Sequence, residues 1–138
     1  MDVLTRPVVL DASIVIRFLD SQHPQHLSAV ECLLGVDAPL VINDLTLAEV
    51  LVGAFRTGDE MELLRTITDD MSVQVFGESG VAWAMHLART RATTTPKLTT
   101  PDAVVLATAQ RVSGQVLSCD TRLQDAAEAD NRLYPSSA

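Results

Sequence analysis

Four acidic side chains lie at positions where the sequence pattern indicates a functional site: Asp11, Glu49, Asp102 and Asp120. Each one ends a short apolar stretch or lies in a helix-like segment. Partly buried carboxylates that meet repel one another strongly, and a divalent cation removes that repulsion. Hard oxygen ligands suit Mg²⁺ or Mn²⁺, and such an ion can hold a phosphoryl oxygen and lower the pKa of a bound water. If the four acids meet, the sequence therefore predicts a metal site.

The segments around these acids alternate between strand-like and helix-like patterns. Strands are expected at residues 7–11, 39–43, 71–76 and 115–120, with another near 132–135, and helices at 13–20, 25–35, 45–58, 59–70, 80–92, 100–114 and 122–130. This alternation indicates a three-layer α/β/α sandwich with a short, mostly parallel central sheet. Sites in such folds form beyond the carboxyl ends of strands, where Asp11 and Asp120 are expected to lie.

Each acid also has a purely structural explanation. Asp11 and Asp120 can cap the helices that follow them. Thr46 and Glu49 fit a capping box. Asp102 suits the positive end of a helix. Four such coincidences at one edge of the sheet are a weaker explanation than one shared site, although each stays open at this stage.

Two helices carry further expectations that the structure can test. Thr100 is expected to cap the helix at 100–114, with Pro101 in its first turn and Gly114 at its end. In the helix at 80–92, Val81 and Trp83 are expected to reach the core.

Composition indicates a single globular domain over residues 1–138, with 47% apolar residues and 20% charged residues. No apolar run approaches the roughly 20 residues that span a bilayer. A secretory leader is not evident either, so we expect a cytoplasmic protein without membrane contact. The net charge of −8 opposes a nucleic-acid partner at first sight. However, acids gathered in one site would account for part of it, and a basic partner protein would suit the rest.

The cysteines and histidines of the chain point to no chemistry of their own. Cys32 and Cys119 are far apart in sequence and are expected to be buried, reduced thiols. The three histidines form no close pair that would suit zinc and are expected on the surface or on helix faces; they are His23, His26 and His86.

The segments that carry the four acids resemble those of a known family. The motifs "VVLDASIVI", "LTLAEVLVGAF", "TTPDAVVLATA" and "VLSCDTRL" occur in the order and context of the PIN-domain nucleases. They are most similar to the VapC-type ribonuclease toxins of VapBC toxin–antitoxin systems. The resemblance extends from Val8 to about Leu123, and four acids in order make it specific.

The resemblance implies an endoribonuclease whose four acids surround one or two Mg²⁺ or Mn²⁺ ions. Asp11 and Asp102 would be direct ligands, while Glu49 and Asp120 would bind directly or through water. Such a toxin hydrolyses phosphodiester bonds of single-stranded or structured RNA (tRNA, rRNA or mRNA) and inhibits translation. The resemblance does not say which RNA is cut, nor how many ions are bound.

Further residues acquire roles by the same resemblance. Ser13 and Ser118 would hydrogen-bond a ligand carboxylate or a metal-bound water. Asp125 is a spare acid of the last helix whose place in the site is undecided. The segment 89–100 is rich in threonine and basic residues, and we hypothesise that it contacts RNA phosphates. The candidates for this contact are Arg17, Arg89, Arg91 and Lys97.

The resemblance also implies partners. A toxic nuclease must be restrained, and the expected inhibitor is a small VapB-type antitoxin whose basic C-terminal segment wraps the acidic toxin. Members of the family usually form homodimers, and apolar helices near the N-terminus offer a surface for this.

Three other functions compete with an active nuclease. A metal-dependent binding module of the adhesion type needs a second serine where Val15 stands. A receiver domain needs a lysine late in the chain, whereas Lys97 comes before Asp102. A PIN fold that has lost catalysis and serves as a scaffold would not need all four acids. A nuclease assay separates these alternatives.

Overall fold

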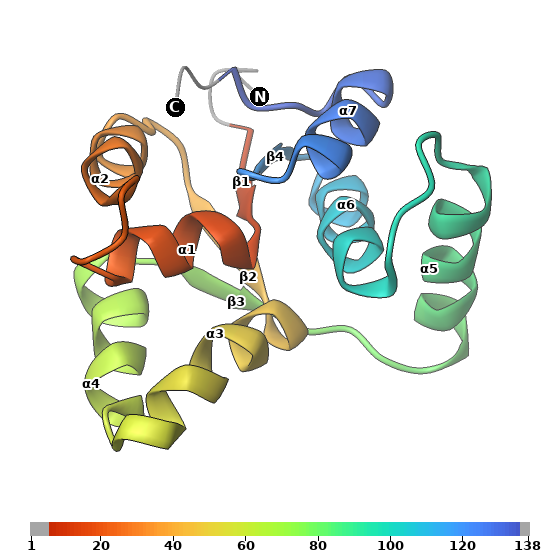
Figure 1. The fold of residues 1–138 in the computed structure, drawn as a ribbon. Helices are drawn as coiled ribbons and strands as arrows, with labels where there is room; N and C mark the ends of the chain where they lie inside the picture. The colour runs from red at the N-terminus through yellow and green to blue at the C-terminus, as the bar shows by residue number, and fades with distance from the viewer. Residues whose placement is uncertain (1–5, 136–138) are drawn as a thin grey trace.

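Four short parallel strands form the centre of the fold in the computed structural model, which describes residues 6–135 (Figure 1). They are β1 (Val8–Leu10), β2 (Leu40–Asn43), β3 (Gln74–Phe76) and β4 (Gln115–Leu117). Their order across the sheet is β3-β2-β1-β4, so the first and last strands are neighbours. The expected parallel sheet is thus confirmed, and its two central strands are β2 and β1.

Helices connect the strands and cover both faces of the sheet. They are α1 (Ala12–Leu19), α2 (His26–Leu34), α3 (Asp44–Thr57), α4 (Glu60–Arg65), the π-helical turn η2 (Thr66–Asp70), α5 (Val81–Thr93), α6 (Thr100–Val112) and α7 (Thr121–Ala129). Among the described residues, no helix is both long and apolar enough to cross a bilayer.

Alternate side chains of each strand enter two separate hydrophobic clusters, one on each face. In β1, Val8 and Leu10 pack with residues of α1, α2 and α3, whereas Val9 packs with residues of α6 and α7. All three strand residues are completely buried, as expected for a parallel sheet covered on both sides. The arrangement is therefore the expected α/β/α sandwich.

The helix α5 stands outside this sandwich and packs on α6 (Figure 1, right). Val81 is 78% exposed, so the expectation that it reaches the core is wrong. Trp83 is buried as expected, with the Phe76 ring centroid 6.1 Å away. The Arg111 guanidinium lies 6.0 Å from the Trp83 ring and forms an ion pair of 3.1 Å with Glu78. Trp83 therefore anchors α5 both to α6, through Arg111, and to the edge strand β3, through Phe76.

Two helix starts differ from the expected ones. The helix α3 begins at residue 44, because the Asn43 side chain at the end of β2 accepts a hydrogen bond of 2.8 Å from the backbone of the helix. Thr46 and Glu49 therefore form no capping box, and this structural explanation of Glu49 is wrong. In α6, Thr99 is the cap and Thr100 is the first helical residue.

Some boundaries also shift. The helix expected at 59–70 is divided into α4 and η2, and the strand expected from residue 71 begins only at Gln74. The strand expected near the C-terminus is reduced to a single bridge between Val116 and Leu133.

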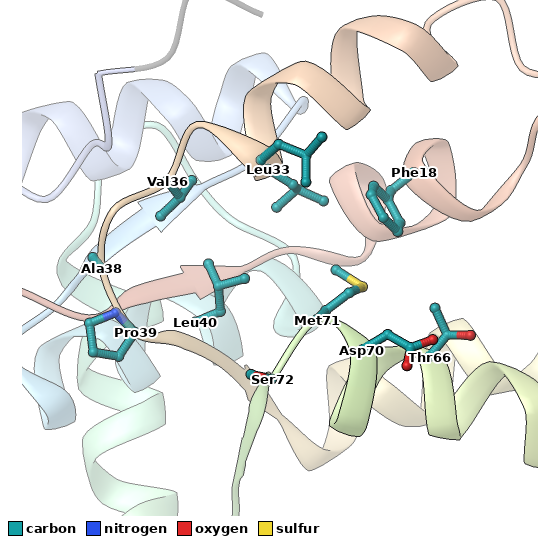
Figure 2. A pocket seen from close by; sticks show the side chains of 11 residues that line it. Phe18, Leu33, Val36, Ala38, Pro39, Leu40, Thr66, Asp70, Met71 and Ser72 are labelled. Atoms are coloured by element: carbon teal, nitrogen blue, oxygen red, sulfur yellow. The ribbon is translucent and has the colours of Figure 1, made fainter.

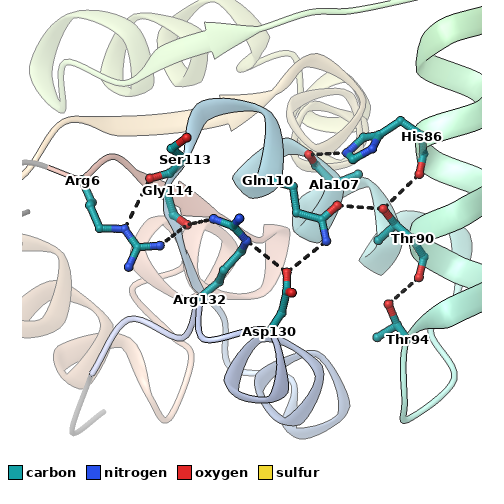
Figure 3. Close-up of polar contacts among 10 residues, drawn as sticks. All are labelled: Arg6, His86, Thr90, Thr94, Ala107, Gln110, Ser113, Gly114, Asp130 and Arg132. Carbon is teal, nitrogen blue, oxygen red and sulfur yellow. Dashed lines mark hydrogen bonds and ion pairs between the residues drawn. The ribbon is translucent and has the colours of Figure 1, made fainter.

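Arginine side chains hold the start of β4 against the start of β1 (Figure 3). Arg6 and Arg132 both donate hydrogen bonds to the Gly114 carbonyl, at 3.1 and 3.2 Å, and Arg132 also pairs with Asp130 at 3.0 Å. A Cβ atom on Gly114 would lie 2.5 Å from the carbonyl oxygen of Pro7, so only glycine fits here. This close approach brings the two strands into register ahead of the acids that follow them.

Candidate active site

Asp11 follows β1 directly and lies between the two helical layers. Its backbone N–H donates to the Leu117 carbonyl at 3.0 Å, which continues the pairing of β1 with β4. The residue is only 8% exposed. It occupies the cap position of α1, yet its side chain makes no capping hydrogen bond. Helix capping therefore does not explain why a carboxylate is buried here.

Two serine hydroxyls hold the Asp11 carboxylate instead. Ser13 and Ser118 both donate to Oδ2 of Asp11, each at 2.7 Å. The Ser13 oxygen in turn accepts the Cys119 backbone N–H at 3.0 Å, and the Ser118 oxygen accepts the Asp120 backbone N–H at 2.9 Å. Backbone donors thus orient the hydroxyls, and the hydroxyls orient the carboxylate. Within residues 6–135, Oδ1 of Asp11 receives no hydrogen bond, which leaves this oxygen available to a ligand.

Glu49 on α3 and Asp102 on α6 lie close enough to the other acids for their charges to interact. Burial, followed by the negative charges of Asp11 and Asp102, raises the pKa of Glu49. Burial, followed by the charges of Asp120 and Asp11, raises the pKa of Asp102, although hydrogen bonding with Thr99 opposes this. The four expected acids are therefore coupled electrostatically across α1, α3, α6 and α7.

Asp120 caps a helix, as one explanation from the sequence expected, and its charge also acts on another of the four acids. Its side chain accepts the Leu123 backbone N–H at 3.1 Å and so caps α7, while its charge also acts on Asp102. Asp125 lies exposed on the same helix, and its charge is not among those that shift the pKa of Glu49 or Asp102.

The carboxylates do not form a ready-made metal centre. Across residues 6–135, no three side chains of His, Cys, Asp or Glu are arranged as the ligands of one ion. Even so, the donors are all oxygen atoms, and the pKa values of Glu49 and Asp102 are raised first by burial and then by neighbouring carboxylates, whose repulsion a divalent cation would relieve. The residues therefore fit a hard cation chemically, although no three of the described side chains are arranged to hold one.

The raised pKa of Asp102 predicts that this carboxylate destabilises the metal-free fold at neutral pH. When the pKa is higher in the folded than in the unfolded state, the folded state binds more protons, so stability falls as pH rises through that window. Asp102→Asn should therefore raise the unfolding temperature in EDTA at about pH 7, and this gain should vanish below about pH 4. Thermal unfolding followed by circular dichroism measures it, with Asp125→Asn as the control. A gain that does not change with pH would contradict the electrostatic cause.

The basic residues that were expected to bind RNA have different surroundings. The charge of Arg17 acts on the Cys119 thiol, whose pKa is raised mainly by burial. Arg91 donates to the Leu98 carbonyl at 3.0 Å and to the Thr100 hydroxyl at 3.1 Å, and these bonds hold the loop before α6. Arg89 and Lys97 are exposed, the first on α5 and the second in that loop.

Two residues of the first turn of α7 belong to this region and were missed in the sequence. Nη1 of Arg122 donates to the Lys97 carbonyl at 3.2 Å, and its charge lowers the pKa of Asp102 against the larger opposing effects. Nε2 of Gln124 donates to the Ser118 carbonyl at 2.6 Å. Their position shortly after the last acid was the one signal available, because the Arg122 contact joins segments 25 residues apart.

An apolar pocket of about 530 Å³ lies away from the acids (Figure 2). It is lined by Phe18 and Leu33 from α1 and α2, by Pro39 and Leu40 at the start of β2, and by Met71 after η2. These residues precede the strands, whereas the acids follow them. The pocket is therefore separate from the carboxylate site.

Solved structures with similar folds include toxins. VapC20 of Mycobacterium tuberculosis, described as a toxin that cleaves the sarcin–ricin loop, aligns with a TM-score of 0.71 at 11% identity over 86% of this chain and 94% of its own. A toxin–antitoxin complex from Klebsiella pneumoniae aligns with a TM-score of 0.70 at 23% identity, over 83% and 88%. VapBC2 of Rickettsia felis, bound to promoter DNA, aligns with a TM-score of 0.63 at 12% identity, over 87% of this chain and 92% of its own.

At these identities, the likeness to solved structures shows the fold alone. No curated protein sequence matches the chain. The family comparison goes further, because residues 8–129 match the PIN domain and so include all four acids and both serines. Since the match spans most of the sequence, this chain belongs to the PIN domain family.

Proposed function

We propose that this protein is a metal-dependent endoribonuclease, a toxin of the VapC type that inhibits translation by cutting RNA in the cytoplasm. The observation that carries the proposal is the buried carboxylate of Asp11, which two serine hydroxyls orient at 2.7 Å and which is coupled to Glu49 and Asp102. Membership of the PIN domain family and the fold of solved VapC toxins support the same function.

Asp11, Glu49, Asp102 and Asp120 would hold Mg²⁺ or Mn²⁺, as one or two ions. When bound, the ion would supply charge neutralisation of the phosphate and a water of lowered pKa. Ser13 and Ser118 keep the Asp11 carboxylate in one orientation, which reduces the cost of arranging a ligand. A carboxylate of raised pKa, such as Glu49, is suited to accept a proton from an attacking water.

Partners follow from the same proposal. A VapB-type antitoxin with a basic segment would complement the net charge of −8. Leu27 and Leu34 on α2 are 75% and 78% exposed, and Leu34 also lines the apolar pocket of Figure 2. Such exposed side chains suit contact with a partner protein, either the antitoxin or a second copy in a homodimer.

The test is cleavage of labelled tRNA, rRNA and mRNA fragments by the purified protein. We expect cleavage with Mg²⁺ or Mn²⁺, complete loss with EDTA, and recovery when the metal is restored in excess. Cleavage that persists in EDTA would exclude the metal-dependent mechanism. If none of the three RNA classes is cut with either metal, the interpretation as an inactive PIN-fold scaffold replaces this one.

A further inference from the structure

Arg122 joins three parts of the chain at the rim of the carboxylate site. It lies in the first turn of α7, two residues after Asp120. Its Nη1 donates to the carbonyl of Lys97 in the loop between α5 and α6, at 3.2 Å. Its charge also reaches Asp102 in the first turn of α6. The guanidinium is therefore placed where the loop, α6 and α7 meet.

The contacts of Arg122 leave most of its binding capacity unused. A guanidinium has five N–H donors. In residues 6–135 the bond to Lys97 is the one hydrogen bond of this side chain, and its approach to Asp102 is not an ion pair. The residue is also exposed to solvent. An exposed cation with open donors beside several carboxylates is poorly explained by fold stability alone, because solvated charge pairs contribute little.

Several other arginines of the chain already have hydrogen-bond partners of their own. Arg122 lies at the start of α7, two residues after Asp120, and its side chain reaches the loop before α6. Arg91 donates from Nε to the Leu98 carbonyl and from Nη1 to the Thr100 hydroxyl. Side chains engaged elsewhere, with backbone carbonyls or with acids, are Arg6, Arg111 and Arg132.

RNA must approach this site against repulsion, because the carboxylates carry the same sign of charge as its backbone. A cation at the rim offsets this repulsion locally, and the planar fork of arginine matches two phosphate oxygens at once. Building on the proposed nuclease function, we propose that Arg122 binds a backbone phosphate of the RNA substrate at the edge of the carboxylate site. Its bond to Lys97 fixes the guanidinium in position before RNA arrives.

The test measures binding of a fluorescent single-stranded RNA by anisotropy in EDTA, where no cleavage is expected. Arg122→Gln removes the charge but keeps a donor for the Lys97 carbonyl, whereas Arg122→Lys keeps the charge and loses the fork. Arg65→Gln at the end of α4 removes the same charge elsewhere and is the control. Circular dichroism and the fluorescence of Trp83, the one tryptophan, verify that each variant is folded.

We expect Arg122→Gln to weaken binding roughly tenfold and to reduce the slope of log K against log salt by about 0.7, one single-strand phosphate contact. The RNA affinity of Arg122→Lys should lie between those of Arg122→Gln and the wild type. The affinity of Arg65→Gln should match that of the wild type. If Arg122→Gln binds RNA as the wild type does while the wild type cleaves with Mg²⁺, this inference fails and the nuclease function stands. A wild type that neither binds nor cleaves RNA overturns both.

Discussion

Replacing Asp11 by asparagine is expected to lower kcat for RNA cleavage by roughly 10³-fold or more, because the site loses its most buried metal-binding charge. The amide has nearly the same size as the carboxylate, and its oxygen can still accept the hydroxyls of Ser13 and Ser118. Burying a neutral amide also costs less than burying a charge. The variant should therefore keep the wild-type fold while losing activity.

The measurement is single-turnover cleavage of the best RNA substrate at saturating Mg²⁺, alongside thermal unfolding of both proteins. Asp125→Asn is the matched control, since it makes the same chemical change on the exposed side of α7. It should cleave at the wild-type rate. If Asp11→Asn retains wild-type activity, Asp11 holds no metal, and the site must be sought elsewhere.

The serine pair carries the second large effect. Ser13→Ala and Ser118→Ala are each expected to lower Mg²⁺ affinity and cleavage by about 10- to 100-fold, because the hydroxyls orient a ligand without touching the ion. Both donate to the same oxygen of Asp11, so either one still holds the carboxylate when the other is removed. The double variant should then lose more than the product of the two single losses.

Calorimetric titration with Mg²⁺ and kcat/KM for RNA cleavage provide the two readouts for this double-mutant cycle. Ser28→Ala on the exposed face of α2 is the control. Losses that multiply without coupling would mean that the serines act on separate groups. An unchanged Mg²⁺ affinity in all variants would instead assign them a purely structural role.

The positions of the acids at the ends of strands and helices were predictable because they obey local rules. Asp11 and Asp120 follow apolar strands, and strand ends of parallel sheets share one edge. Glu49 was less certain, since a capping box explained it equally well in the sequence. That explanation fails because Asn43, the last residue of β2, takes the cap and starts α3 earlier. A local motif was overridden by the strand that precedes it.

Two features that the prediction missed involve contacts between segments far apart in the chain. Val81 has the right spacing for a core position, but α5 packs on α6 outside the sandwich, so one helical face stays in solvent. Arg122 escaped notice because its partners, Lys97 and Asp102, are 20 or more residues away and belong to other elements. Hydrophobic periodicity describes a single element and does not specify which element packs beside it.

The pairing of β1 with β4 has a consequence for the synthesis of the protein. Asp11 emerges early from the ribosome, but the hydroxyl of Ser118 that orients it lies 107 residues later in the chain. Asp120 and Arg122 follow later still. A nascent chain therefore carries no assembled site until its last strand has been made and has paired with its first. For the ribonuclease proposed above, this strand order would delay activity until β4 has been made and has paired with β1.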